Sequence, residues 1–230
     1  IMDGLDEEKT INFVKMLSDL GHESPIEHIS FTFGIEGVSR SLLAQITRHR
    51  IASFSVQSQR YVKKDNFIYI TPPAISENRE INNIYEKSIL DSFEQYNKIA
   101  DMLSEKYYNE FINSGVSEKQ ARSKAEKKAI EDARFVLPNA CETKMVVTMN
   151  ARSLLNFFRL RCCNRAQWEI RAVAIEMLKL CYKTAPSIFS AAGPACCNGS
   201  CSEGKMSCGK MSEVKKTFSK IKESLKDEEK

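Results

Sequence analysis

Hydrophobic positions repeat at helical spacing along most of the chain and alternate, as in a β-strand, in only a few short stretches. Helical spacing and end signals predict helices over residues 6–20, 39–48, 78–113, 117–136, 151–162 and 165–182. Alternation over 29–35 predicts a strand, and β-prone runs predict two more over 67–70 and 144–149. From residue 51 the chain is expected to be rich in loops. We therefore expect an α/β (α+β) protein in which helices cover an antiparallel sheet.

Composition limits the class of protein. The chain has 230 residues, of which 42% are hydrophobic and 28% charged, so it can bury a core as one domain or a closely joined pair. No apolar run approaches the roughly 20 residues that cross a bilayer, and no targeting sequence opens the chain, which predicts a cytoplasmic protein. Lysine plus arginine exceeds aspartate plus glutamate by 34 − 30 = 4, which favours an anionic ligand over the coating of a nucleic acid. Because Ile1 is not a start methionine, we expect a fragment or a trimmed chain.

The chain changes character near residue 190, which predicts a main domain over 1–190 and a tail over 191–230. The chain has eight cysteines and no secretory signal, which favours reduced thiols or metal ligands over disulfides. Four lie in the tail: Cys196, Cys197, Cys201 and Cys208. Their spacing lacks the paired Cys-x2-Cys of a strong zinc signature, so a structural metal and a redox or unliganded tail both remain open. A helical stripe of Val214, Phe218, Ile221 and Leu225 could dock on its own domain or on a neighbour.

The densest polar block follows the expected helix over 39–48. Gln45 and the cations Arg48, His49 and Arg50 lead into a loop rich in hydroxyl groups. Basic residues at a helix end can simply complement the helix dipole. Ser58 and Arg60, however, are two residues apart, and an extended loop would present them together to phosphate oxygens. No histidine is placed by sequence to activate Ser58 as a nucleophile, so binding is favoured over attack.

Two further polar clusters are candidates for ligand contacts. Arg152, Asn156 and Arg159 form one stripe of an expected helix, where an asparagine and an arginine can bind a flat heteroaromatic edge and a diphosphate. Asn150 could instead serve as the N-cap of that helix. The segment 21–28 holds two of the three histidines, but its His-x5-His spacing supplies no recognised metal geometry. Together the clusters indicate a phosphorylated, planar ligand.

Arg48-His49-Arg50, followed by seven residues and Ser58, closely resembles the signature of the flavin-dependent thymidylate synthases. The segments 21–28, 150–153 and 167–170 also resemble that family, in the same order, and the similarity runs from about residue 6 to 185. The resemblance implies reductive methylation of dUMP to dTMP. Methylenetetrahydrofolate would give the one-carbon unit, FAD would carry hydride and NADPH would reduce the flavin. It also implies a homotetramer whose sites are shared between subunits.

The resemblance also implies roles for individual residues. The positions matching those that hold FAD are His22, Ser24, Arg48, His49, Arg50, Asn150, Arg152 and Asn156. The positions matching those that hold the nucleotide are Gln45, Arg48, Ser58, Gln59, Arg60, Arg134 and Arg161. Arg161 is the expected catalytic residue, because a guanidinium beside the uracil would stabilise a negative ring nitrogen. No metal is expected.

Departures from the family pattern keep two rivals open. Ser55-Val56 stands where the family commonly has Asn-Glu. The family has a strand-containing N-terminal segment before its first helix, whereas this sequence starts almost at that helix. The connection over 114–134 is longer than usual. The first rival is therefore a member that binds flavin without methylating. The second is a nucleic-acid-binding module that uses the same arginines on phosphates, although the chain lacks a stripe of alternating aromatic and basic residues. Nothing matches the nucleophile segment of the cysteine-dependent thymidylate synthases.

Overall fold

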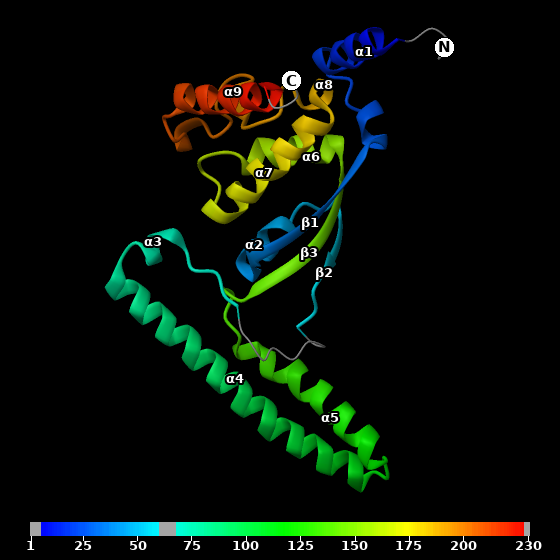
Figure 1. The fold of residues 1–230 in the computed structure, drawn as a ribbon, viewed down its shortest axis with the longest axis vertical. Coiled ribbons are helices and arrows are strands. Elements are labelled where there is room, and N and C mark those ends of the chain that lie inside the picture. The colour runs from blue at the N-terminus through cyan, green and yellow to red at the C-terminus, as the bar shows by residue number, and fades with distance from the viewer. Residues whose placement is uncertain (1–5, 60–67, 228–230) are drawn as a thin grey trace. The chain divides into compact units, whose positions relative to one another are not determined.

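The computed structural model describes residues 6–59 and 68–227. The chain divides into two compact units. Unit 1 is drawn from residues 1–34, 44–55 and 146–230, and unit 2 from residues 35–43 and 56–145. The strands run from one unit into the other, and each unit has helices of its own (Figure 1).

A small antiparallel sheet is built from β1 (Ser30–Ser39), β2 (Ser53–Val56) and β3 (Glu142–Asn150). Their order is β1-β3-β2, so β3 is central (Figure 1). In unit 1 the hydroxyl oxygens of Thr32 and Thr148 lie 2.9 Å apart across β1 and β3. Burial alternates along β3, as expected for a strand with one face against a core. The predicted strands over 29–35 and 144–149 are therefore confirmed.

The prediction fails at two strands. β2 lies in the stretch expected to be loop. Its residues alternate between polar and apolar, but four residues are too few for the alternation to distinguish a strand from a loop. The strand expected over 67–70 is wrong in the part described: Tyr69 forms a single antiparallel bridge to Cys141, and the residues beside it are not strand. Phe67 lies outside the described residues. Pro72 and Pro73 follow directly, and proline cannot donate to a ladder.

Unit 1 is mainly helical. Its elements are α1 (Glu7–Asp19), η1 (Pro25–His28), α6 (Ala151–Arg161), α7 (Trp168–Thr184), α8 (Pro186–Phe189), η3 (Ala195–Cys197), η4 (Gly204–Met206) and α9 (Met211–Asp227). Phe157, Phe158 and Phe189 are fully buried in its core. The ring of Phe31 on β1 packs edge-on against Phe189, with centroids 5.4 Å apart.

Helix boundaries differ slightly from the predicted ones. α2 (Arg40–Ile46) ends two residues before Arg48, where the chain turns instead of continuing the helix. α7 begins at Trp168 and not at Arg165, because the side chain of Gln167 accepts hydrogen bonds from the first backbone N–H groups of the helix. Ser39 caps α2, since its Oγ accepts from the N–H of Leu42 at 3.1 Å.

The C-terminal helix α9 belongs to unit 1 and packs against α7 and η3. Its predicted apolar stripe is confirmed, since Val214, Phe218 and Leu225 are buried and Ile221 is half-buried. The tail therefore docks on its own chain, although the division into domains 1–190 and 191–230 stays a prediction.

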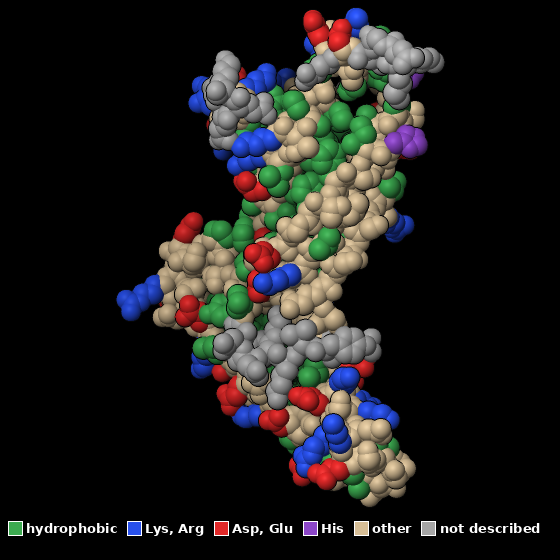
Figure 2. Space-filling view, turned by 45° about the vertical axis from the view of Figure 1, so that its right-hand side comes forward, with side chains coloured by type: hydrophobic (Ala, Val, Ile, Leu, Met, Phe, Trp, Pro, Cys, Tyr) green, Lys and Arg blue, Asp and Glu red, His purple; other side chains and the backbone are tan. Residues whose placement is uncertain are grey.

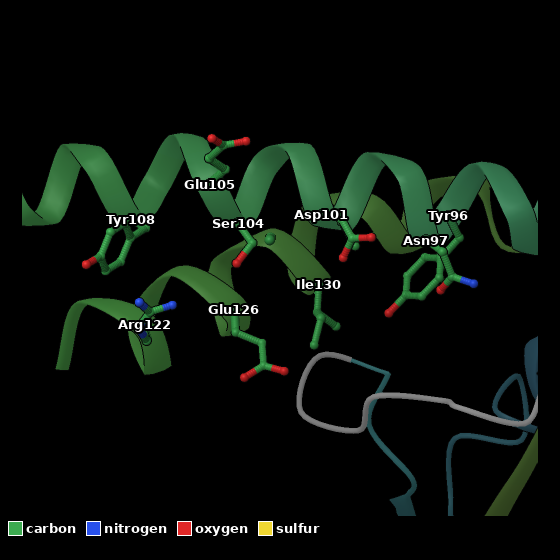
Figure 3. A pocket seen from close by; sticks show the side chains of 11 residues that line it. Tyr96, Asn97, Asp101, Ser104, Glu105, Tyr108, Arg122, Glu126 and Ile130 are labelled. Carbon is green, nitrogen blue, oxygen red and sulfur yellow. The ribbon is translucent and has the colours of Figure 1, made fainter. Parts of the chain in front are cut away.

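Unit 2 contains α3 (Pro73–Ser76) and a hairpin of α4 (Arg79–Asn113), α5 (Glu118–Ala133) and the short η2 (Arg134–Val136). Gly115, with φ +82°, makes the turn between the two long helices. Small alanines of α5 are buried against α4, and Tyr107 Oη donates to Asp132 at 2.6 Å. Further along the hairpin a groove of about 430 Å³ is lined by polar side chains such as Asp101, Arg122 and Glu126 (Figure 3).

Acidic and basic side chains alternate on the hairpin, as the lower part of Figure 2 shows. Several form ion pairs one helical turn apart, such as Lys98 with Glu94 at 2.6 Å and Arg122 with Glu118 at 3.0 Å. These pairs are exposed and contribute little to stability. The mixture of both signs gives the hairpin, which includes the long connection over 114–134, a solvated helical surface.

Phe218→Ala tests whether the tail is part of the folded unit. Phe218 is almost fully buried, and truncation of a buried phenylalanine should lower the free energy of unfolding by about 3–5 kcal/mol. Chemical denaturation of the full chain measures the change. Lys216→Ala, on the exposed side of α9, is the matched control. Equal stability of the two variants would show that α9 is not part of the cooperative fold.

Candidate functional site

The end of α2 presents the predicted cationic block. Ile46 is fully buried and anchors the last helical turn. Beyond it the backbone turns, with the N–H of Arg48 donating to Gln45 O at 3.3 Å and the N–H of His49 donating to Ile46 O at 3.1 Å. Arg48 and Arg50 are exposed, whereas His49 between them is half-buried. The block therefore directs its two arginines outward and its histidine toward the core of unit 1.

Arg161, the last residue of α6, meets this block. Its Nε donates to His49 Nε2 at 3.0 Å, and the His49 ring packs edge-on against Phe157 with centroids 4.9 Å apart. Burial, followed by the positive charge of Arg161, lowers the pKa of His49. His49 is therefore neutral near pH 7, with the lone pair on Nε2 and its proton on Nδ1. Two residues far apart in sequence thus form one contact.

The positive charges at this place are not balanced by carboxylates. Burial and the nearby Arg48 charge lower the pKa of Arg161. An arginine guanidinium stays charged in proteins at neutral pH. Within the described part of the chain, Arg48, Arg50 and Arg161 form no ion pair with an acidic side chain. A cluster of guanidiniums without counter-charges suits a phosphate or diphosphate ligand.

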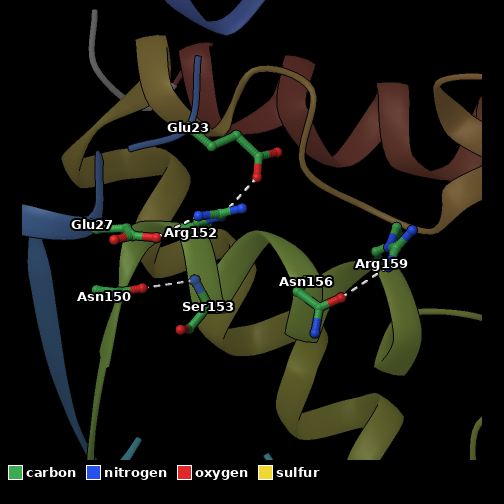
Figure 4. A network of polar contacts seen from close by, with 7 residues as sticks. All are labelled: Glu23, Glu27, Asn150, Arg152, Ser153, Asn156 and Arg159. Atoms are coloured by element: carbon green, nitrogen blue, oxygen red, sulfur yellow. Dashed lines mark hydrogen bonds and ion pairs between the residues drawn. The ribbon is translucent and has the colours of Figure 1, made fainter. Parts of the chain in front are cut away.

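A second network joins the other two predicted clusters (Figure 4). Arg152 donates from Nε to Glu23 at 3.0 Å and from Nη1 to Glu27. The hydrogen bond and charge of Glu27 are the main reasons why the pKa of Arg152 is raised. The segment 21–28 and helix α6 therefore meet through an ion-paired arginine. We did not predict Glu23 and Glu27 as site residues, although their four-residue spacing beside a histidine was a usable signal.

The remaining predicted flavin-binding residues lie close to this network in sequence. Asn150 caps α6, since its Oδ1 accepts from the N–H of Ser153 at 2.8 Å, so the structural interpretation of Asn150 is confirmed (Figure 4). Asn156 Oδ1 accepts from Arg159 Nη2 at 3.0 Å. His22 and Ser24 are exposed between α1 and η1, and Ser24 makes no side-chain cap bond to η1.

The predicted nucleotide-binding residues are divided between the units. Gln45 and Arg161 lie in unit 1, and Ser58, Gln59 and Arg134 lie in unit 2. Ser58 and Gln59 follow the end of β2, where the N–H of Gln57 donates to Lys144 O at 2.9 Å. Arg134 begins η2, and its Nε donates to Glu131 O at 3.1 Å. Arg60 lies outside the described residues.

The cysteines form no disulfide, and no group of three or more potential ligands in the described part of the chain is arranged to hold a metal ion. Burial raises the pKa of Cys162 and of Cys181 to about 12, so both thiols stay protonated. The structure therefore gives no support to the zinc alternative for the tail. None of the helices described is long and apolar enough to cross a bilayer.

The fold defines a mixed α/β protein, and unit 1 carries arginines without acidic partners near His49. Comparison with known proteins gives the family. A family profile described as thymidylate synthase complementing protein matches residues 2–187. A flavin-dependent thymidylate synthase of Clostridium tetani is 57% identical over 214 residues, covering 93% of this chain and 83% of the relative. One of Geobacter sulfurreducens is 47% identical, covering 90% of this chain and 79% of the relative. The chain belongs to the flavin-dependent thymidylate synthase family.

His49→Phe and His49→Gln separate two functions of the histidine. Phenylalanine keeps the ring packing on Phe157 but removes the acceptor for Arg161, whereas glutamine offers an amide oxygen in its place. Loss of a partner for a buried, charged donor costs about 1–3 kcal/mol, so His49→Phe should lower kcat/KM roughly 10–100-fold. His49→Gln should retain more activity. If the two variants lose activity equally, the hydrogen bond to Arg161 does not orient that residue.

The hydrogen bond between His49 and Arg161 should also fail in acid. The folded pKa of His49 lies below its ordinary value of 6.5, so the unfolded chain binds more protons there and stability falls as the pH drops below about 6.5. Protonated His49 cannot accept from Arg161, and kcat/KM should fall over the same range. Melting temperature and initial rate measured against pH test this expectation. If the rate and the melting temperature of His49→Gln fall in acid over the same pH range, a group other than His49 causes the loss.

Proposed function

We propose that this chain catalyses the reductive methylation of dUMP to dTMP. Methylenetetrahydrofolate gives the one-carbon unit, FAD is the bound cofactor and NADPH is the reductant. Membership of the flavin-dependent thymidylate synthase family carries the proposal. The arrangement around His49 supports it. Arg161 donates to His49 and lies near Arg48, and neither arginine has an acidic partner among the described residues. Both FAD and dUMP carry phosphate groups that could bind to such a cluster. NADPH, a homotetramer and a cytoplasmic location belong to the same proposal and rest on the resemblance.

The donors of unit 1 fit FAD. His22, Ser24, Arg48, His49, Arg50, Asn150, Arg152 and Asn156 would hold it. Arg152 illustrates the fit, because Glu23 and Glu27 engage two nitrogens of its guanidinium and leave Nη2 with no acceptor among the described residues. The two carboxylates thus orient a fork whose third nitrogen can reach a ligand. When bound, the flavin supplies hydride transfer, and the protein supplies position and charge.

Arg161 is the proposed catalytic residue. His49 holds its Nε, which leaves the terminal nitrogens to face the pyrimidine ring of the nucleotide. A guanidinium there stabilises negative charge on the ring nitrogen and so favours attack of the ring carbon on the one-carbon unit. Gln45, Arg48, Ser58, Gln59, Arg60 and Arg134 are the proposed residues for the rest of the nucleotide. Their distribution along the chain is consistent with a site shared between subunits.

A second candidate is a member that binds flavin and nucleotide without methylating. Ser55 and Val56, which end β2, replace a common Asn-Glu pair and so remove a carboxylate. Val56 can contribute to a shared site only through its backbone. We favour the active enzyme, because the guanidinium assigned to the chemistry, that of Arg161, is present and is held by His49.

The purified full chain tests the proposal directly. It should be yellow with bound flavin, dUMP should perturb the flavin spectrum, and dTMP should form when methylenetetrahydrofolate and NADPH are supplied. Arg161→Gln should keep the flavin and lower kcat at least about 100-fold, because it removes the charge beside the ring. Arg165→Gln, at an exposed position beyond α6, is the control.

Three results would contradict the proposal in different ways. Flavin and dUMP binding without dTMP would support the inactive family member. A colourless protein that binds DNA tightly would support the nucleic-acid-binding module. Full activity in Arg161→Gln would support the synthase activity but would show that Arg161 has no part in the chemical step.

A further inference from the structure

Six of the eight cysteines gather in one thiol cluster of unit 1. Two follow the last turn of α6, two lie in η3, and two lie in the loop that leads to α9. In chain order they are Cys162, Cys163, Cys196, Cys197, Cys201 and Cys208. Their mutual influence on thiol pKa values shows that they are neighbours in space. Segments more than thirty residues apart therefore bring their thiols together.

Two pairs of adjacent cysteines lie beside each other in the thiol cluster. Cys162 lies near Cys197, and Cys163 lies near Cys196. A hydrogen bond also joins the side chains of Cys196 and Cys197. Adjacent residues have Cα atoms about 3.8 Å apart, below the usual span of about 4.4–6.8 Å for a disulfide. A disulfide is therefore favoured between the two pairs and not within either of them.

Hydrogen bonds hold the backbone on both sides of the thiol cluster. The N–H of Arg165 donates to Cys163 Sγ at 3.5 Å, and the N–H of Ala166 donates to Cys163 O at 2.9 Å. The N–H of Cys197 donates to Pro194 O at 2.9 Å, and α9 packs against η3. Both turns are therefore ordered before any bond forms between them, so joining them costs little further conformational entropy.

Cys163 and Cys196 differ in exposure. Cys163 is half-buried, so a small oxidant can reach it, whereas Cys196 is buried. Burial, followed by the charge of Cys163, raises the pKa of Cys196. The charge of Cys163 has a larger effect on Cys196 than the charges of Cys201 and Cys208, as expected for a closer neighbour. The geometry thus pairs an accessible thiol with a protected one.

The charges beside the thiol cluster favour thiol chemistry over a bound metal ion. Lys215 and Lys222 of α9 lie near Cys197, and Arg171 of α7 lies near Cys162. Positive charge of the protein repels a metal cation and favours a thiolate. These cations complement the finding that no group of three ligands in the described part of the chain is arranged for a metal.

We propose that Cys163 and Cys196 are a redox-active pair that a peroxide converts into a disulfide. The Cys163 thiolate attacks one peroxide oxygen, the O–O bond breaks, and water leaves with Cys163 as a sulfenic acid. The Cys196 sulfur then attacks the Cys163 sulfur, the S–O bond breaks, and the proton of Cys196 leaves with a second water. Two thiols are oxidised and one peroxide is reduced to two waters.

The disulfide would tie the tail to the end of α6. Cys163 lies two residues after Arg161, the last residue of that helix, and Cys196 lies in η3. The bond would close the chain between these positions and restrict the unfolded state. The inference is independent of the proposed function, because it concerns a thiol site that the methylation does not use.

Peptide mapping of the full chain tests the inference. The reduced protein is treated with hydrogen peroxide, its remaining thiols are alkylated, and the tryptic peptides are analysed by mass spectrometry without reduction. The segment after Arg161 should be linked to the segment that holds Cys196, two thiols should be lost from each chain, and dithiothreitol should restore them. Oxidation should not lower the melting temperature, because the bond joins ordered turns.

Single substitutions identify the pair. Cys163→Ser and Cys196→Ala should each abolish the linkage between the two segments. Cys208→Ser, at another half-buried cysteine of the thiol cluster, is the matched control and should keep it. The melting temperatures of the reduced variants show whether each one folds. If Cys196→Ala does not fold, Cys163→Ser alone decides the result.

Four results would overturn the inference. They are a parent protein with no linked peptide, a linkage that persists in Cys163→Ser, a disulfide between two copies of the chain, and a lower melting temperature after oxidation. A metal ion that copurifies with the reduced protein and protects the thiols from peroxide would also overturn it, because the thiols would then be ligands. None of these results bears on dTMP formation, so the synthase proposal is tested separately.

Discussion

The hydrogen bond from Arg161 Nε to His49 Nε2 is the contact on which the site depends. It joins the turn after α2 to the end of α6, and it requires a neutral imidazole because a protonated one has no lone pair to offer. Burial of His49 against Phe157 provides that neutrality. One packing contact thereby fixes the protonation state of His49 and the orientation of the guanidinium that we assign to the chemistry.

Guanidiniums without carboxylate partners are the common feature of both units. In unit 1, Arg48 lies near the like charge of Arg161. In unit 2, Arg134 lies near the like charge of Arg40. Such pairs are unfavourable in an isolated protein and become favourable when an anion binds between them. Arg152 shows the opposite arrangement, since Glu23 and Glu27 hold it. The contrast separates arginines that have no acidic partner from one that the protein holds through two carboxylates.

Long periodic elements could be predicted from the sequence, and short ones could not. The helices α4, α6 and α9 and the strands β1 and β3 repeat their apolar positions often enough for the period to be clear. β2 has four residues, and its pairing with β3 is decided by tertiary contacts that no local pattern records. The apparent strand near Tyr69 has suitable residues but forms a single bridge before two prolines end the extended stretch.

The site could be predicted as a list of residues and not as a set of contacts. Spacing along the chain and family resemblance indicated His49, Arg152 and Arg161, but neither indicated that His49 accepts from Arg161 or that Glu23 and Glu27 hold Arg152. Such pairs join segments more than a hundred residues apart and depend on the fold.

Nitrogen NMR of the imidazole side chains tests the central contact most directly. The chain has three histidines, so single substitutions assign the His49 signals. The account predicts that at pH 7 His49 carries a proton on Nδ1 and none on Nε2, and that Arg161→Gln changes the Nε2 signal. A doubly protonated ring, or a proton on Nε2, would contradict the hydrogen bond from Arg161 and the site built on it.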